Sequence, residues 1–275
     1  MEKTVHRKMI LENLRFDIFL LTNTTLAQIV VALVLLGFGI VVFVHHASSW
    51  INRTFFLLAT SVTIWLAGFA MARLSGDPHL ALFWFKFGYI GIINISFATY
   101  AFSVFYTKQK KQHLLVALGG VCSVIWMYLL FQDNILFLDG VYSYPWGYYP
   151  KAGLYYTAFL VYFFFFATFL GANLVQWYYK TKIRSEKNVT LILIIAFLIA
   201  YLGASDFLPS VGIDIFNIEP LGFIPIALWI FLVGYTVLHY RIWNVRFVAS
   251  QTIYYGFISA IILITYSFLF WAFFR

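Results

Sequence analysis

The sequence predicts an all-α membrane protein: a polytopic membrane helical bundle with a seven-span, receptor-like core and a further, eighth span. Hydrophobic residues make up 63% of the 275 residues, charged residues make up only 10%, and the mean hydropathy is +0.88. Soluble domains are about 45–50% apolar and about 25% charged. The apolar residues also gather in long runs, and a run of roughly 18 can cross a bilayer as a helix.

Each of these runs is predicted to be a helix, because lipid offers no other partner to the backbone short of a closed barrel. Barrel strands are excluded, because the runs are too long and too uniformly apolar. The predicted helices cover residues 25–45, 54–73, 80–106, 114–131, 154–178, 188–205, 219–239 and 251–274.

Charged residues separate the first four runs. Arg53 precedes the second run and Arg73 ends it. Asp77 lies before the third run, and a short basic segment, residues 108–111, follows it. Charges are costly inside hydrocarbon, so these positions are expected at the membrane surfaces.

The later runs are separated by longer connections. Residues 131–153 form an aromatic segment before the fifth run, and the basic segment 180–187 follows that run. Asp206 lies at the end of the sixth run. Glu219 and Pro220 open the seventh, where an acidic residue before a first-turn proline suits a helix N-terminus.

The distribution of Lys and Arg predicts the orientation. Ten of these residues follow spans one, three, five and seven, namely Arg53, Lys108, Lys110, Lys111, Lys180, Lys182, Arg184, Lys187, Arg241 and Arg246. Two, Arg73 and Lys151, follow the even-numbered spans. The positive-inside rule therefore places the first set in the cytoplasm and residues 1–24 outside, as an extracytoplasmic tail. That tail carries four basic residues of its own, partly offset by three acidic ones.

Several function classes are excluded by the residues. The net charge of +8 comes from short breaks between spans, which argues against nucleic acid as a partner. Cys122 is the single cysteine and lies within a span, so neither a disulfide framework nor a thiolate metal site is expected. The predicted spans contain no His-x-x-x-His or Glu-x-x-His pair, and the sequence contains no nucleotide-binding motif. The sequence therefore predicts no catalytic residues, no metal and no cofactor.

Polar residues within the outer half of the bundle are the candidates for ligand binding. Lys86 lies inside the third span, where an ionisable group is a functional candidate; alternatively, its long stem reaches the interface. Tyr89 falls on the same helix face and Asn94 lies to one side. Asp206 is expected at the depth of Lys86, either as its ion-pair partner or as a hydrated residue at a helix end.

The aromatic segment 131–153 is the most unusual connection. It holds Trp146, Tyr148 and Tyr149 among prolines and glycines that favour turns. These rings are either an ordinary interfacial belt or an ordered outer cap over a ligand cleft. The second interpretation predicts a cleft lined by Lys86, Tyr89, Asn94, Trp146, Tyr148, Tyr149 and Asp206.

Three stretches together resemble a known family. They are residues 83–91, residues 144–153 and the segments between 206 and 245 that end in Tyr-Arg-Ile-Trp-Asn-Val. In these stretches the chain is similar to the N-terminal seven-transmembrane sensor region of bacterial histidine kinases and related diguanylate cyclases, over about residues 25–246. The resemblance implies a bacterial inner membrane, an N-terminus outside and a cytoplasmic output. It also implies a signal exit at Tyr240, Arg241 and Arg246.

Residues 247–275 depart from that pattern. An output domain would follow at this point in the family, whereas these residues are predicted to form an eighth transmembrane helix. Either the chain is a fragment of a longer protein, or it stands alone, or this stretch lies along the membrane. We expect a signal-input module that binds an unknown small or lipidic ligand, or another envelope cue, from the outer side. Its partners would be the lipid bilayer, an output domain in cis or in trans, and a second copy of the chain. The alternatives are a small-solute transporter and a structural subunit of a membrane complex.

Overall fold

The computed structural model describes residues 2–132, 136–214 and 220–240, with side chains from residue 24 onward except at a few positions of the last helix. The elements are α1 (Glu2–His45), α2 (Trp50–Arg73), α3 (Pro78–Tyr106), α4 (His113–Phe131), β1 (Leu138–Tyr144), β2 (Gly147–Ala152), α5 (Tyr156–Lys180), α6 (Arg184–Leu202) and α7 (Phe223–Tyr240), with short 3₁₀ turns η1 (Lys110–Gln112), η2 (Gly203–Phe207) and η3 (Pro209–Val211). The predicted eighth span, Arg241 and Arg246 lie outside the described residues.

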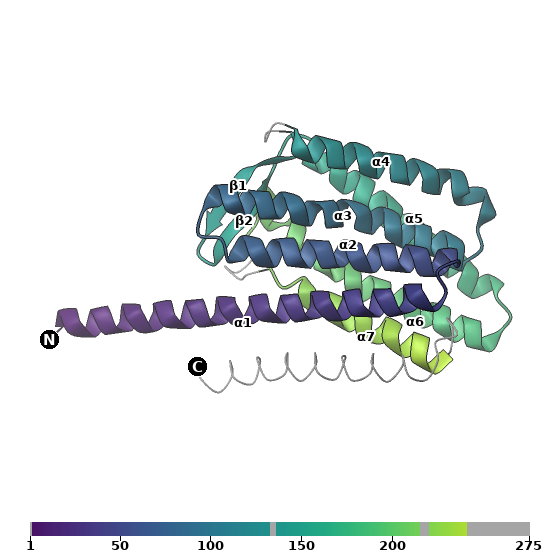
Figure 1. Ribbon diagram of the computed structural model, residues 1–275, viewed down its shortest axis with the longest axis horizontal. Coiled ribbons are helices and arrows are strands. Elements are labelled where there is room, and N and C mark those ends of the chain that lie inside the picture. Colours follow the sequence, from purple (N-terminus) through teal and green to yellow (C-terminus); the bar gives the residue numbers. More distant parts are fainter. Residues whose placement is uncertain (1, 133–135, 215–219, 241–275) are drawn as a thin grey trace.

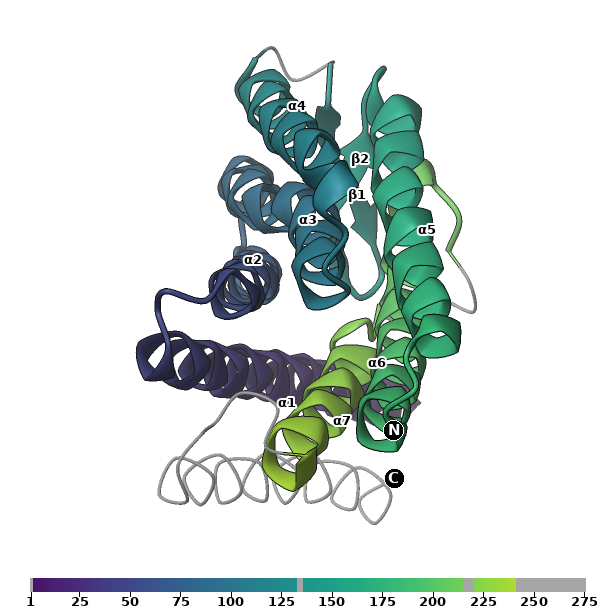
Figure 2. The same cartoon turned by 90° about the vertical axis from the view of Figure 1, so that its right-hand side faces the viewer.

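The prediction of an all-α membrane bundle is confirmed. Within the described ranges, six helical segments are long and apolar enough to cross a membrane, and α7 adds a further apolar helix of 18 residues. Seen along the helices, α1, α2 and α3 follow one another on one side of the bundle and α5, α6 and α7 lie on the other, with α3 packed against α5 and α4 packed on α3 (Figure 2). Most boundaries lie within four residues of those predicted.

The largest difference in a helix boundary is at the N-terminus. The first span was expected to begin at residue 25, after a separate tail. Instead α1 is one continuous helix of 44 residues from Glu2, and it extends past the bundle at the end where the two strands lie (Figure 1). Apolar composition locates the part of a helix that lipid covers, but it does not locate where the helix begins.

Helices α2 and α3 pack closely along their length because glycines remove side chains from their interface. A Cβ on Gly68 would lie 2.6 Å from the Cα of Gly88. A Cβ on Gly91 would lie 2.6 Å from the backbone nitrogen of Trp65 and would also collide with the carbonyl oxygen of Ser61. Small residues permit such backbone contact between membrane helices, so α2 and α3 form one tightly joined pair.

A β-hairpin covers one end of the bundle and is the feature that the sequence did not predict (Figure 1). Strands β1 and β2 pair in antiparallel fashion, with Tyr142 opposite Tyr149 and Tyr144 opposite Gly147. Gly140 and Gly147 adopt positive φ angles of 88° and 129°, a conformation that glycine adopts at little cost. Residues 138–152 of the aromatic connection are therefore folded as a hairpin over this end of the bundle; that they form an outer cap over a ligand cleft stays a prediction.

Side-chain amides join helices at the opposite end of the bundle. Asn173 of α5 donates to Ser103 of α3, at 3.1 Å, and exchanges hydrogen bonds of 2.8 and 2.9 Å with Gln112 at the start of α4. Gln112 in turn accepts a 2.8 Å bond from Tyr100. Interhelical hydrogen bonds of this kind stabilise bundles in lipid, and they fix α3, α4 and α5 to one another.

Candidate functional site

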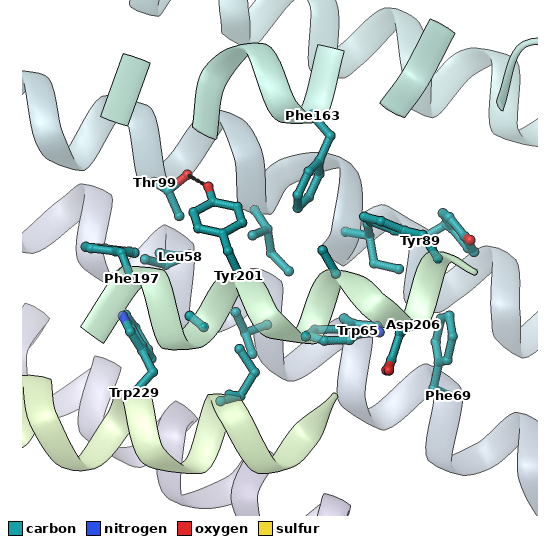
Figure 3. A pocket seen from close by; sticks show the side chains of 18 of the residues that line it. Leu58, Trp65, Phe69, Tyr89, Thr99, Phe163, Phe197, Tyr201, Asp206 and Trp229 are labelled. Atoms are coloured by element: carbon teal, nitrogen blue, oxygen red, sulfur yellow. Dashed lines mark hydrogen bonds between the residues drawn. The ribbon is translucent and has the colours of Figure 1, made fainter. Parts of the chain in front are cut away.

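A cavity lies inside the bundle, between the α2–α3 pair and the α6–α7 pair (Figure 3). The centre of a water molecule could move through ≈ 60 Å³ of it, whereas a single water needs about 10–15 Å³. Helix α5 and strand β2 complete the walls. Aromatic rings form much of the lining, including Trp65, Phe69, Tyr89, Phe163, Phe197 and Trp229.

Three of the seven residues predicted to bind a ligand line this cavity. Tyr89 reaches it from α3, Tyr149 from β2 and Asp206 from η2. The Tyr89 hydroxyl lies 2.8 Å from that of Tyr156 and 3.4 Å from Ser210 Oγ. The structure thus brings together residues that are up to 117 positions apart, all at the end of the cavity beneath the hairpin.

The other four predicted residues do not line the cavity. Lys86 is half-buried on α3. The Asn94 amide donates to Ile90 O at 2.8 Å and contacts the sulfur of Met127 on α4, at 3.5 Å, so it faces another helix. Trp146 packs edge-on behind Tyr149, with 5.4 Å between ring centroids, and Tyr148 packs against the apolar core. A direct pair between Lys86 and Asp206 stays a prediction.

The end of the cavity farther from the hairpin is closed by rings that the sequence did not single out. Trp229 of α7 stacks against Phe55 of α2, with 6.0 Å between centroids, and meets Phe197 of α6 at 5.8 Å. Thr99 and Tyr201 join α3 to α6 through a 3.1 Å hydrogen bond (Figure 3). Helix α7 therefore meets the opposite wall through side chains that border the cavity.

Two oppositely charged side chains hold the backbone just before α7. Asp206, only 9% exposed, accepts a 3.1 Å hydrogen bond from the Gly222 backbone nitrogen. Arg73, 8% exposed at the end of α2, donates through Nη2 to the carbonyl oxygen of Pro220 at 3.0 Å. Asp206 therefore bonds the peptide backbone at this position, and its interpretation as a hydrated residue stays a prediction. We call Arg73, Asp206, Pro220 and Gly222 the α7 clamp.

A side chain at Gly222 would displace the carboxylate of the α7 clamp. A Cβ on Gly222 would lie 2.6 Å from Cγ and 2.8 Å from Oδ1 of Asp206, and would also collide with Oδ2. The carboxylate therefore rests directly on the peptide backbone. The sequence marks Arg73 only as one of two basic residues predicted at the outer face. Because basic residues are rare at that face, this position was the sequence feature that could have pointed to a buried role for Arg73.

The hairpin is attached to the same clamp. The Tyr149 hydroxyl donates a 2.6 Å hydrogen bond to the carbonyl oxygen of Asp206, and Tyr144 donates to Pro209 O at 2.7 Å. Burial raises the pKa of the Tyr149 phenol well above its ordinary value, the charge of Asp206 raises it further, and nearby Arg73 opposes the shift. The phenol therefore stays protonated at neutral pH and can serve as a donor.

Comparison with known proteins identifies the family. A family model described as the N-terminal 7TM region of histidine kinase matches residues 28–246, which is most of the chain. The chain belongs to this family. It is a membrane-embedded sensor-input region of the histidine kinase type, and this implies a multi-pass protein of the inner membrane with a cytoplasmic output domain. No curated protein and no solved structure gave a significant match.

A metal-binding cluster would be another kind of functional site in the part of the chain that the structure describes. No group of three or more His, Cys, Asp or Glu side chains there could hold a metal ion. What the site can do is enclose an apolar molecule and hold the start of α7. Both properties suit an input region that changes helix positions.

We expect the α7 clamp to contribute substantially to stability. Replacing Asp206 by Asn removes the charge from a buried acceptor and should lower the free energy of unfolding by about 1.5–3 kcal/mol. Asp139→Asn is the matched control, because Asp139 forms a 2.6 Å ion pair with Lys151 in which both side chains are well exposed. That substitution should have no measurable effect. Thermal unfolding in nanodiscs would compare them; equal effects would contradict the assignment.

Proposed function

We propose that this chain receives its cue in the cavity beneath the hairpin and transmits it through the α7 clamp. The observation that carries the proposal is that Tyr149 and Asp206 both line the cavity and both belong to the contacts that hold the start of α7. A molecule that displaces either side chain therefore acts on the helix that leads toward the output. Lys86, Asn94, Trp146 and Tyr148 would support this cleft from outside its lining.

The two walls of the cavity, the α2–α3 pair and helix α7, are held by different kinds of contact. A bound molecule would therefore move α7 more readily than the α2–α3 pair. Helices α2 and α3 meet backbone to backbone at their glycines. Helix α7 reaches that pair through the clamp and through the Trp229–Phe55 contact. A ligand that fits one arrangement of these side chains better than another shifts the population toward it.

The change in helix position would be transmitted out of the membrane at the end of α7. Tyr240 is the last residue of α7, and Tyr240, Arg241 and Arg246 are proposed as the signal exit. From there the change would reach an output domain in the same chain or a partner protein. A second copy of the chain is proposed as a further partner. The N-terminus is proposed to lie outside, on the side of the hairpin, in agreement with the count of basic residues.

Substituting the clamp glycine should change the output without removing the cavity. In Gly222→Ala the new methyl group displaces the Asp206 carboxylate, so we expect basal autophosphorylation of the histidine kinase that this input region serves, measured in membranes, to change by about 2–30-fold, the range of mutational effects on coupling. Gly171→Ala on α5 is the control, because no atom lies within 4 Å of its added Cβ. Incorporation of radiolabelled phosphate measures both. Unchanged phosphorylation in Gly222→Ala would contradict the route through the clamp.

Labelling of introduced cysteines should establish the orientation. In a Cys122→Ser background, Ser143→Cys in the hairpin is expected to react with a membrane-impermeant maleimide on intact cells. Ala47→Cys, in the connection between α1 and α2, should react only after lysis. Both positions are exposed. The reverse pattern would place the N-terminus in the cytoplasm and contradict the proposed outer position of the hairpin.

A further inference from the structure

We infer that the cavity binds an uncharged, elongated, apolar molecule drawn from the hydrocarbon phase of the bilayer. The inference rests on the proposed function, because it takes the cavity to be the place where the cue is received. Three observations support it. The hydroxyl groups of the lining are hydrogen-bonded within the protein, the Asp206 carboxylate is hydrogen-bonded to the backbone, and the cavity is elongated.

The hydroxyl groups of the lining already have partners within the protein. Thr99 pairs with Tyr201 at 3.1 Å, Tyr89 pairs with Tyr156 at 2.8 Å, and Tyr149 donates to a backbone carbonyl. A polar ligand would have to break these bonds or leave its own groups unpaired, and either outcome costs free energy.

Among the fully buried donors of the lining in the described part of the chain, the indole nitrogen of Trp229 has no hydrogen-bond partner. Figure 3 shows this nitrogen on the side of the ring that faces Phe197, and the two ring centroids are 5.8 Å apart. The two rings are tilted at 53° to each other. This buried donor is an exception to the internal pairing of the polar groups in the lining.

Charge also favours a neutral ligand. Among the described residues, Asp206 is the only charged one in the lining, and its carboxylate accepts a hydrogen bond from the Gly222 nitrogen at the start of α7. The positive charge of Arg73 lies nearby as well: it lowers the pKa of the Tyr149 phenol, whereas the negative charge of Asp206 raises it. A charged ligand would bring a further charge into this buried region, and each buried charge carries a large desolvation penalty.

The shape of the cavity favours an elongated molecule. Its lining follows α6 and η2 from Phe197 to Phe207 and follows α3 from Tyr89 to Thr99. Ten residues of helix rise by about 15 Å, so the space is long and narrow, bordered by rings on both sides. Molecules of this shape and polarity concentrate in hydrocarbon, which makes the bilayer their source.

Binding can be followed at one wall of the cavity. The full chain would be labelled with fluorotryptophan and reconstituted in nanodiscs, and the Trp229 signal would be assigned by fluorine NMR from its loss in Trp229→Phe. Three probes of equal chain length would be added at matched mole fractions of the lipid: decane, decylammonium and decanoate.

We expect decane to shift the Trp229 signal in a saturable manner. Each charged probe should need a mole fraction at least about 100-fold higher for the same shift, because its head group would be desolvated in the cavity. A stronger response to decylammonium would overturn the inference and identify Asp206 as a counter-ion. A stronger response to decanoate, or no saturable response to decane, would also overturn it.

A matched pair of variants separates cavity binding from lipid partitioning. Ala200→Phe adds a ring to a residue of the lining and should abolish the shift caused by decane. Leu198→Phe, on the same helix at a position 65% exposed, should keep it. Should Ala200→Phe fail to fold, the ranking of the three probes on the unmodified chain still decides. These are binding measurements, so a failure here leaves the effect of Gly222→Ala on phosphorylation standing.

Discussion

The α7 clamp is the interaction on which the rest of this account depends. Arg73 and Asp206 are buried and oppositely charged, and each holds one backbone group of the short segment before α7. Buried charges are tolerated only where partners are close at hand. The clamp therefore fixes the position of α7 through groups that are sensitive to small displacements. When one of these groups moves, the hydrogen bonds of the others are broken as well.

The packing of the bundle favours movement of α7 over movement of the other helices. Glycines bring α2 and α3 into backbone contact, and amide groups join α3, α4 and α5 at the opposite end. Helix α7 is instead held to α2 by Arg73 at one end and by the ring of Phe55 farther along. Packed interfaces of this kind tend to have a few discrete arrangements. The cavity lies at the boundary between the firmly joined helices and α7, where a bound molecule would act on both.

The sequence predicted the spans well because composition alone reports lipid exposure over a run of residues. It did not predict the hairpin, because β1 and β2 are short and rich in tyrosine that serves equally well at a membrane interface. Arg73 was treated as an exception to the charge count, since nothing local shows that a helix-end arginine reaches Pro220, 147 residues away. Trp229 and Phe55 lie inside uniformly apolar runs, where no pattern distinguishes a cavity wall from a lipid-facing side chain. Tyr89 was predicted from its place on the Lys86 face of its helix, Tyr149 from the aromatic segment, and Asp206 as a charge at the end of a span. All three line the cavity, and their binding of a ligand stays a prediction.

The most direct test of the central claim is a distance measurement between α2 and α7. Spin labels at Met71→Cys and Leu228→Cys, both at exposed positions, would be placed in a Cys122→Ser background and measured by double electron–electron resonance in nanodiscs. If the clamp holds α7 against α2, Asp206→Asn should shift the mean distance by about 1–2 Å or more, or should broaden its distribution into two populations. Superimposable distributions with and without the Asp206 charge would show that the clamp does not set the position of α7, and would contradict the account.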